Sequence, residues 1–287
     1  MTTYAEYQAI AKAYDEDKLA TCSSLYFWVF LRLNKPLKDL HVLDAGCRTG
    51  KYALAMLEAG VGHVTLMDEH HIFLEKAMER CQAYLDSGRA TATLCSLPKL
   101  PYEEGTFDCV MVNNTFHRNP LKHSKHSYFQ TVVLEARKAL KPGGLLLINM
   151  TFPNQYQHGY WYFHLAQNAM KFFVENQLTQ DETLEMLKSS MLIDSQIVVD
   201  TTALYIPEDL YFDPNGPLNE RVSGADSFWD KLTDSEKGKI EKKIRRMRKA
   251  GTMRDYIRMK DMDRTKVGQV SLVLASKRLE TEAAPLW

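Results

Sequence analysis

The chain has 287 residues, and its 36 Lys and Arg balance its 36 Asp and Glu, so the formal net charge is zero. This length suits one large α/β domain, or one domain with an appended cap. A protein that binds nucleic acid usually has a basic excess, so we expect no nucleic-acid partner, although zero net charge permits a local basic patch. No apolar run is long enough to span a bilayer, and acids occur early in the chain. We therefore expect no membrane partner, no secretory signal and a cytoplasmic location.

The five cysteines are scattered and form no C-x-x-C pair. That spacing favours neither a disulfide framework nor a zinc site. We therefore expect free thiols in a reducing compartment, and no bound metal.

Short apolar runs alternate with helical patterns between residues 41 and 150. Strands that alternate with helices predict a mostly parallel sheet with helices on both faces, the doubly wound or Rossmann-like α/β fold. Ligands of such sheets bind at the carboxyl ends of the strands. We predict strands at 41–46, 63–68, 90–95, 106–114 and 145–150, and helices at 51–60, 72–88 and 127–140, the last stopped by Pro142, Gly143 and Gly144.

The remaining chain is less regular. Residues 154–191 have mostly helical patterns, while 193–204 and 269–278 are predicted strands, the last one antiparallel. The charged stretch between these two strands is too long for a plain loop. We therefore predict four parts: an N-terminal helical lid (1–40), an α/β domain (41–204), a helical cap insertion (205–266), and the final strand with its tail (267–287).

The segment VLDAGCRTG (42–50) carries the strongest functional pattern, because an apolar strand ends at Asp44 and turns through Gly46 and Gly50 into a helix. Glycine permits positive φ and a close ligand approach, and a helix N-terminus offers N–H groups to an anion. Asp44 would repel a pyrophosphate, so the segment favours a ligand with an ammonium group beside a carboxylate, as in methionine. Asp68 ends the next strand, where an acid can accept hydrogen bonds from both ribose hydroxyls of a nucleoside. Alternatively, Asp68 caps the following helix.

Four segments in this order resemble the class I S-adenosylmethionine-dependent methyltransferases, nearest the group that contains the ubiquinone and menaquinone biosynthesis methyltransferases. The resemblance implies S-adenosylmethionine as cofactor, with Asp44, Gly46, Gly50 and Asp68 at its site, Asn113 near its methionine part, and Tyr14 in a lid over it. The segments are VLDAGCRTG (42–50), TLMDEHHIFLEKA (65–77), LPYEEGTFDCVMVNNTFHRNP (100–120) and LEARKALKPGGLLLI (134–148).

Two positions depart from the family pattern. Arg48 stands where the family usually has glycine, and Ser96 stands where the family often has an acid that holds the adenine amino group. The resemblance implies that Ser96 and its neighbour Leu97 contact the cofactor, since a serine oxygen can accept the same hydrogen bond. We expect Arg48 to point away from the sulfonium, because two positive charges repel.

Two segments supply candidate residues for the methyl acceptor. His117 follows the predicted strand at 106–114. At that place it could take a proton from a hydroxyl or an amine of the acceptor. Alternatively, it is a packed or surface histidine. The segment QYQHGYWYFH (155–164) is dense in aromatics with polar tips, which suit a pocket wall as well as core packing. We predict Tyr160, Trp161 and His164 as substrate-binding residues and His117 as the catalytic residue.

The segment KGKIEKKIRRMRKAGTMR (237–254) is strongly basic, and Ile240, Ile244 and Met247 share one helix face. Its charges form either a solvated outer face or a site for a phosphate-bearing or acidic substrate.

We predict a methyltransferase that modifies oxygen or nitrogen of a small molecule. The alternatives are a methyltransferase-like protein that binds without transfer, as Arg48 and Ser96 suggest, and an RNA methyltransferase, as the basic segment suggests.

Overall fold

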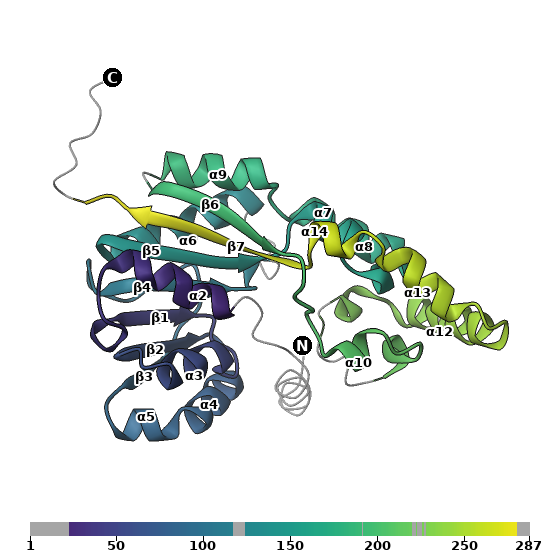
Figure 1. The fold of residues 1–287 in the computed structure, drawn as a ribbon, viewed down its shortest axis with the longest axis horizontal. Coiled ribbons are helices and arrows are strands. Elements are labelled where there is room, and N and C mark those ends of the chain that lie inside the picture. Colours follow the sequence, from purple (N-terminus) through teal and green to yellow (C-terminus); the bar gives the residue numbers. More distant parts are fainter. Residues whose placement is uncertain are drawn as a thin grey trace. The chain divides into compact units, whose positions relative to one another are not determined.

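The computed structural model of the chain describes residues 23–116, 124–190, 192–219, 222, 226 and 228–279. The chain divides into two compact units (Figure 1). The sheet unit comprises residues 22–150, 178–198 and 272–287, and the helical unit comprises residues 1–21, 151–177 and 199–271.

The sheet has seven strands in the order β3-β2-β1-β4-β5-β7-β6. Strands β1 to β5 pair in parallel, and β7 runs antiparallel to both β5 and β6. The predicted Rossmann-like sheet with an antiparallel last strand is therefore confirmed. The strands are β1 (His41–Ala45), β2 (His63–Asp68), β3 (Ala90–Leu94), β4 (Phe107–Asn113), β5 (Leu140–Met150), β6 (Leu192–Asp200) and β7 (Val270–Lys277).

The central strands are apolar because both faces of the sheet are covered. Every residue of β4 is buried, which explains its nearly continuous apolar sequence. Helices α3 and α4 contact β2, and α6 contacts β4 and β5. The described helices of the sheet unit are α2 (Ser23–Phe30), η1 (Leu31–Leu33), η2 (Leu37–Asp39), α3 (Lys51–Glu58), α4 (His71–Arg80), α5 (Gln82–Asp86), α6 (Lys125–Ala139) and α9 (Gln180–Ser189).

Three predicted elements differ from the observed ones. The helix predicted at 72–88 is two helices, because Cys81 between α4 and α5 leaves helical geometry at φ −100° and ψ 16°. The strand predicted from residue 145 begins at Leu140, which pairs with Phe107 ahead of a register shift. The strand predicted to end at residue 204 ends at Asp200, whose carboxylate accepts hydrogen bonds from the backbone N–H groups of Thr202 and Ala203.

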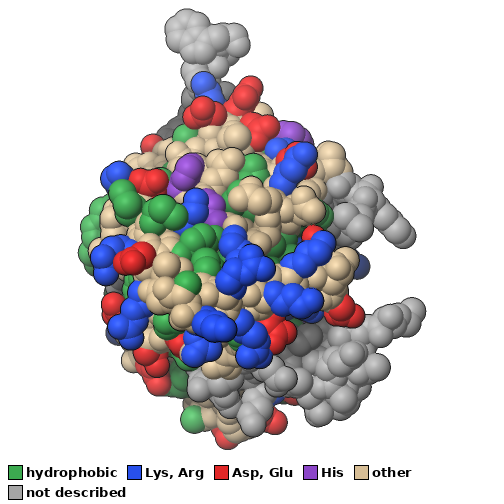
Figure 2. All heavy atoms as spheres, turned by 90° about the vertical axis from the view of Figure 1, so that its right-hand side faces the viewer, with side chains coloured by type: hydrophobic (Ala, Val, Ile, Leu, Met, Phe, Trp, Pro, Cys, Tyr) green, Lys and Arg blue, Asp and Glu red, His purple; other side chains and the backbone are tan. Residues whose placement is uncertain are grey.

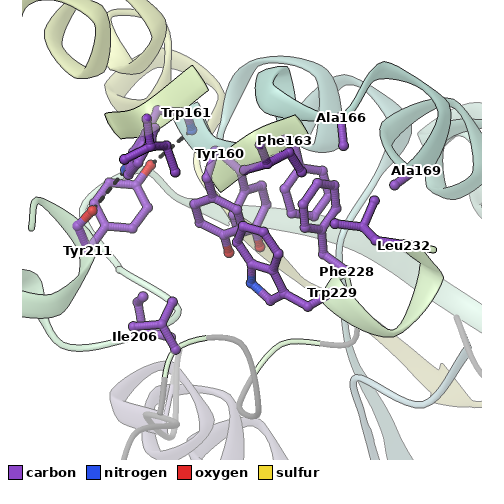
Figure 3. Packing of buried hydrophobic residues seen from close by; sticks show 14 of the residues in the cluster. Tyr160, Trp161, Phe163, Ala166, Ala169, Ile206, Tyr211, Phe228, Trp229 and Leu232 are labelled. Carbon is purple, nitrogen blue, oxygen red and sulfur yellow. Dashed lines mark hydrogen bonds between the residues drawn. The ribbon is translucent and has the colours of Figure 1, made fainter. Parts of the chain in front are cut away.

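The helical unit has its own core of packed aromatic side chains (Figure 3). The rings of Phe163 and Phe228 are stacked with centroids 4.1 Å apart. Among the residues that the structure describes, no helix is long and apolar enough to cross a membrane. The described helices of this unit are α7 (Pro153–His158), η4 (Trp161–Leu165), α8 (Gln167–Asn176), α10 (Glu208–Tyr211), η5 (Gly216–Leu218), η6 (Trp229–Lys231), α12 (Asp234–Lys249), α13 (Met253–Asp261) and α14 (Arg264–Val267).

Candidate functional site

The turn after β1 has left-handed backbone geometry at every second residue. The φ angles are 82° at Gly46, 52° at Arg48 and 75° at Gly50. A Cβ atom on Gly46 would lie 2.5 Å from Cγ2 of Thr115, and one on Gly50 would lie 3.0 Å from Cβ of Ala77. Both glycines are therefore needed for close packing as well as for backbone geometry.

Backbone amides of this turn bind the end of β2. The N–H groups of Gly46 and Cys47 donate to the carbonyl oxygen of Met67, at 2.7 and 2.9 Å. The N–H of Arg48 donates to Oδ2 of Asp68 at 2.9 Å. These three amides therefore fix the ends of β1 and β2 to each other, and they bring Asp68 next to the glycine turn.

Asp68 is held in a defined orientation by two backbone donors. It is buried, and its Oδ1 accepts from the N–H of His70 at 2.9 Å, just before α4 begins. A bond of this kind is expected if Asp68 caps the helix that follows it, which is the alternative role predicted for this residue. Because a carboxylate has about four acceptor positions, two backbone bonds leave capacity for a ligand. The Arg48 guanidinium lies over the Phe73 ring, 4.0 Å from its centroid, in a cation–π contact.

Asp44 is fully buried at the end of β1, with its carboxylate only partly satisfied. Its Oδ1 accepts from Nδ2 of Asn113 at 3.3 Å. Its Oδ2 has no hydrogen-bond partner. Burial raises the pKa of Asp44 to about 7. The raised pKa favours the neutral carboxyl group, and a cation beside Asp44 would favour the ionised form.

Two tyrosines extend this buried network. The hydroxyl of Tyr26 donates to Oδ1 of Asn113, and the Tyr26 ring stacks on Tyr52 with centroids 5.6 Å apart. The Tyr52 hydroxyl accepts from Nδ2 of Asn149 at 3.1 Å. Asn113 therefore joins Tyr26 to Asp44, and it is not among the residues that line the neighbouring pocket.

A pocket opens at the carboxyl ends of β1, β2 and β4, which are neighbours in the sheet. This is the edge where ligands of doubly wound sheets bind. The predicted cofactor residues Gly46, Asp68 and Leu97 line it, as does Arg48. The other described residues around it are Met67, Glu69, His70, Cys95, Asn114, Thr115 and Tyr128.

The remaining predicted cofactor residues lie behind or beside the pocket. Asp44 lies near the end of β1, and Gly50 ends the turn whose residues Gly46 and Arg48 line the pocket. Ser96 is exposed, and its hydroxyl donates to Oε2 of Glu69 at 2.6 Å. Tyr14 and His117 fall outside the residues that the structure describes.

Sequence reasoning missed the wall formed by Asn114, Thr115 and Tyr128. Asn114 has φ 50°, and Oγ1 of Thr115 is buried without a partner. The Asn113-Asn114 pair ends the apolar run of β4, and polar residues at the carboxyl end of a strand could have indicated this wall, since ligands of such sheets bind there. Tyr128 comes from the distant helix α6, and no local pattern could have indicated it. Burial raises the pKa of Tyr128 to about 12, so its hydroxyl keeps its proton.

The predicted acceptor residues lie in the helical unit, within its aromatic core. Tyr160 and Trp161 are almost fully buried. The Tyr160 hydroxyl donates to the carbonyl of Gln269 at 2.9 Å. Nε1 of Trp161 donates to the carbonyl of Tyr211 at 2.8 Å (Figure 3). His164 is partly exposed, and burial lowers its pKa. Acceptor binding by these residues stays a prediction, while their packing within the unit is observed.

The described cysteines Cys47, Cys81, Cys95 and Cys109 are free thiols, as predicted. Burial raises the pKa of Cys81 to about 11, so this thiol is protonated at neutral pH. Within the described ranges, no three or more His, Cys, Asp or Glu side chains gather in a group that could hold a metal ion.

Comparison with known proteins bears on the same part of the chain. Residues 42–144 match the family model described as "Methyltransferase domain". An uncharacterised methyltransferase, YodH, from Bacillus subtilis is 33% identical over 117 residues, covering 39% of this chain and 43% of YodH. Ribosomal RNA large subunit methyltransferase G from Pseudomonas putida is 32% identical over 117 residues, covering 40% of this chain and 30% of that protein. The match therefore spans less than half the length of either relative.

A solved structure extends the likeness in fold. A putative methyltransferase from an antibiotic biosynthesis pathway of Anabaena variabilis has a TM-score of 0.67, with 14% identity over 88% of this chain and 96% of that one. At that identity the likeness shows the fold alone. The family match covers the glycine turn, Asp68 and the strand ends that form the pocket. Residues 42–144 therefore match a methyltransferase domain, and this match includes three of the four segments that resemble the class I S-adenosylmethionine-dependent methyltransferases and most of the fourth.

Proposed function

We propose that the chain binds S-adenosylmethionine in the pocket at the ends of β1, β2 and β4 and transfers its methyl group. The observation that carries this proposal is the pair of buried acids, Asp44 and Asp68, on either side of the glycine turn. Asp68 lines the pocket in a fixed orientation, and Asp44 keeps an oxygen atom without a partner. A buried unpartnered carboxylate oxygen is costly unless a ligand satisfies it.

The residues present fit the groups of this cofactor. Asp68 can accept from two vicinal ribose hydroxyls, and Gly46 lets a ligand approach the backbone closely. Asp44 can hold an ammonium group, because that positive charge would favour the ionised carboxylate. Ser96 and Leu97 are our proposed contacts for the adenine end, and Tyr14 our proposed lid residue.

The bound cofactor would supply a methyl group on a sulfonium, whose sulfur would leave as a neutral thioether and so need little acid–base help. The contribution of the protein is then to position the acceptor and to exclude water. We propose His117 as the group that takes a proton from the acceptor. Arg48 is proposed to stay directed at Phe73, where its charge is held by the ring.

For the acceptor we propose an oxygen or nitrogen atom of a small molecule. The support is the aromatic segment with Tyr160, Trp161 and His164, together with the zero net charge of the chain. An RNA acceptor is the second candidate, because α12 is strongly basic and because of the named activity of the Pseudomonas putida relative. Steep salt dependence of RNA binding would favour that candidate.

The test is incubation of the protein with S-adenosylmethionine carrying a deuterated methyl group and, in parallel, a metabolite extract or total RNA. Mass spectrometry then identifies the labelled product. We expect label in a small molecule, none in RNA, and none in either mixture with Asp68→Ala. Label in RNA would replace the small-molecule proposal, and the absence of any labelled product would leave the non-catalytic alternative in its place.

A further inference from the structure

A hairpin of two helices in the helical unit presents an unusual outer face. Helices α12 and α13 are joined by a turn at Gly251, which has φ 73°. Ile240 and Ile244 of α12 and Ile257 of α13 are buried in the aromatic core of the unit. The inner face of the hairpin is therefore fixed by packing, and the opposite face is left to solvent.

The outer face carries a concentration of positive charge. Residues 234–266 contain 13 Lys and Arg but only six Asp and Glu, although the whole chain is neutral. Figure 2 shows Lys and Arg side chains gathered over one face of the molecule with few acids between them. On α12, helical geometry places Lys242, Arg246 and Lys249 in one row opposite the buried isoleucines.

This row is exposed and has no neutralising partners. Arg245 pairs with Glu241 at 2.6 Å, and Arg264 pairs with Asp261 at 3.0 Å. Among the described residues, Lys242, Arg246 and Lys249 form no ion pair and no side-chain hydrogen bond. Three adjacent like charges repel one another, so a partner that supplies negative charge would relieve the repulsion.

Exposed apolar side chains lie on the neighbouring helix. Met259 is 56% exposed, and Met262, which caps α13, is 64% exposed. Met262 also lines a surface pocket, together with the apolar side chains of Phe212 and Ile257. The wall of this pocket includes Arg254 and Arg258. In the described part of the helical unit, these two methionines are the large apolar side chains that are exposed, and no aromatic side chain is.

We propose that the α12–α13 face attaches the protein to the surface of an anionic phospholipid bilayer. A bilayer offers phosphates to a row of lysines and arginines, and it offers an apolar boundary to methionines beside them. Single-stranded nucleic acid would use exposed aromatic platforms for its bases, which this face lacks in the described residues. We expected no membrane partner because no apolar run spans a bilayer, but surface attachment needs no such run.

The test is co-sedimentation with vesicles of phosphatidylcholine alone and of phosphatidylcholine with 30% phosphatidylserine. We expect binding to the second kind only, with an affinity that falls as salt rises. The triple variant Lys242→Gln, Arg246→Gln, Lys249→Gln should bind at least about tenfold more weakly, because each cation contributes to the attraction. The variant Met259→Ser, Met262→Ser should bind more weakly at high salt, where the apolar contribution dominates.

A matched control variant removes three positive charges from the sheet unit instead of from α12. Lys38, Lys138 and Lys188 are exposed lysines of the sheet unit, and their triple replacement by Gln should leave vesicle binding within about twofold of wild type. Thermal unfolding confirms that each variant is folded. Three outcomes would overturn the proposal: no binding to phosphatidylserine vesicles, equal loss in the control and in the α12 variant, or tighter binding to polyuridylate than to vesicles at the same salt.

Discussion

The two units differ in how many of their buried polar side-chain atoms lack a hydrogen-bond partner. In the sheet unit, Asp44, Thr49 and Thr115 each keep a buried oxygen without a partner, close to the ends of the central strands. In the helical unit, the polar tips of Tyr160, Trp161, Tyr162 and Tyr211 are bonded to partners within the unit. Among the described residues of this unit, Nε1 of Trp229 is the buried side-chain polar atom that has no partner. Buried polar groups are normally satisfied, so unsatisfied ones that gather at a strand edge indicate a ligand site. In the aromatic core, by contrast, most of these polar tips are already bonded within the protein.

The largest effect is expected where the aromatic core is broken. Trp161→Ala should lower the free energy of unfolding by about 3–5 kcal/mol, because it leaves a cavity and removes the bond to the Tyr211 carbonyl. Urea unfolding measures the loss. The control is Trp28→Ala, since Trp28 is 56% exposed and should cost little. An equal loss in both variants would contradict the assignment of Trp161 to the core.

Much of the sheet unit could be predicted from the sequence, because its information is local. The apolar runs end in Asp44 and Asp68, and the spacing of Gly46 and Gly50 sets the turn between them. The buried link from Tyr26 through Asn113 to Asp44 could not be predicted, because it joins residues far apart in sequence. The same limit applies to the aromatic segment 155–164, because its composition suits both a pocket wall and a core. The hydrogen-bond partners of its polar groups are distant in the sequence and could not be predicted.

The next largest effect is expected on the pH dependence of stability, when Asp44 is replaced by Asn in the ligand-free protein. Its folded pKa of about 7 lies above the ordinary 3.8, so its contribution to stability is lost as pH rises from about 4 to 7. Asp44→Asn removes this loss and should make the ligand-free protein more stable than wild type at pH 8, by up to about 4 kcal/mol at 1.36 kcal/mol per pKa unit.

Urea unfolding at pH 5 and pH 8 measures that difference. We expect the gain of Asp44→Asn over wild type to grow between the two pH values, and the exposed control Asp39→Asn to show no such growth. A pH-independent difference would show that Asp44 is already ionised in the folded protein.

The glycine turn offers a smaller, steric test of the sheet unit. Gly46→Ala adds a Cβ atom 2.5 Å from Thr115, whereas Gly88→Ala adds one at a similar positive φ with nothing within 4 Å. The first variant should therefore be less stable than the second by about 1–3 kcal/mol, the usual cost of overpacking. Thermal or urea unfolding of the two variants gives the comparison. Equal losses would mean that only backbone geometry demands glycine at this position.

The smallest effect concerns the opposite edge of the sheet, at the start of β1. Burial and the nearby His63 lower the pKa of His41 from 6.5 to about 4. The stability that depends on neutral His41 is therefore present above pH 6.5 and is lost as pH falls toward 4. His41→Gln should flatten the fall in unfolding free energy over that range, as seen in urea titrations at pH 4.5 and 7. A variant as acid-sensitive as wild type would assign that fall to other groups.

The central claim is that the pocket at the ends of β1, β2 and β4 holds S-adenosylmethionine through Asp68. Calorimetric titration of wild type, Asp68→Asn and the exposed control Asp39→Asn with S-adenosylmethionine tests it directly. We predict that wild type and the control bind alike, and that Asp68→Asn binds at least about tenfold more weakly, since hydrogen bonds to a charged group contribute roughly 1.5–3 kcal/mol. Absence of binding to wild type, or equal affinity in Asp68→Asn, would contradict the account.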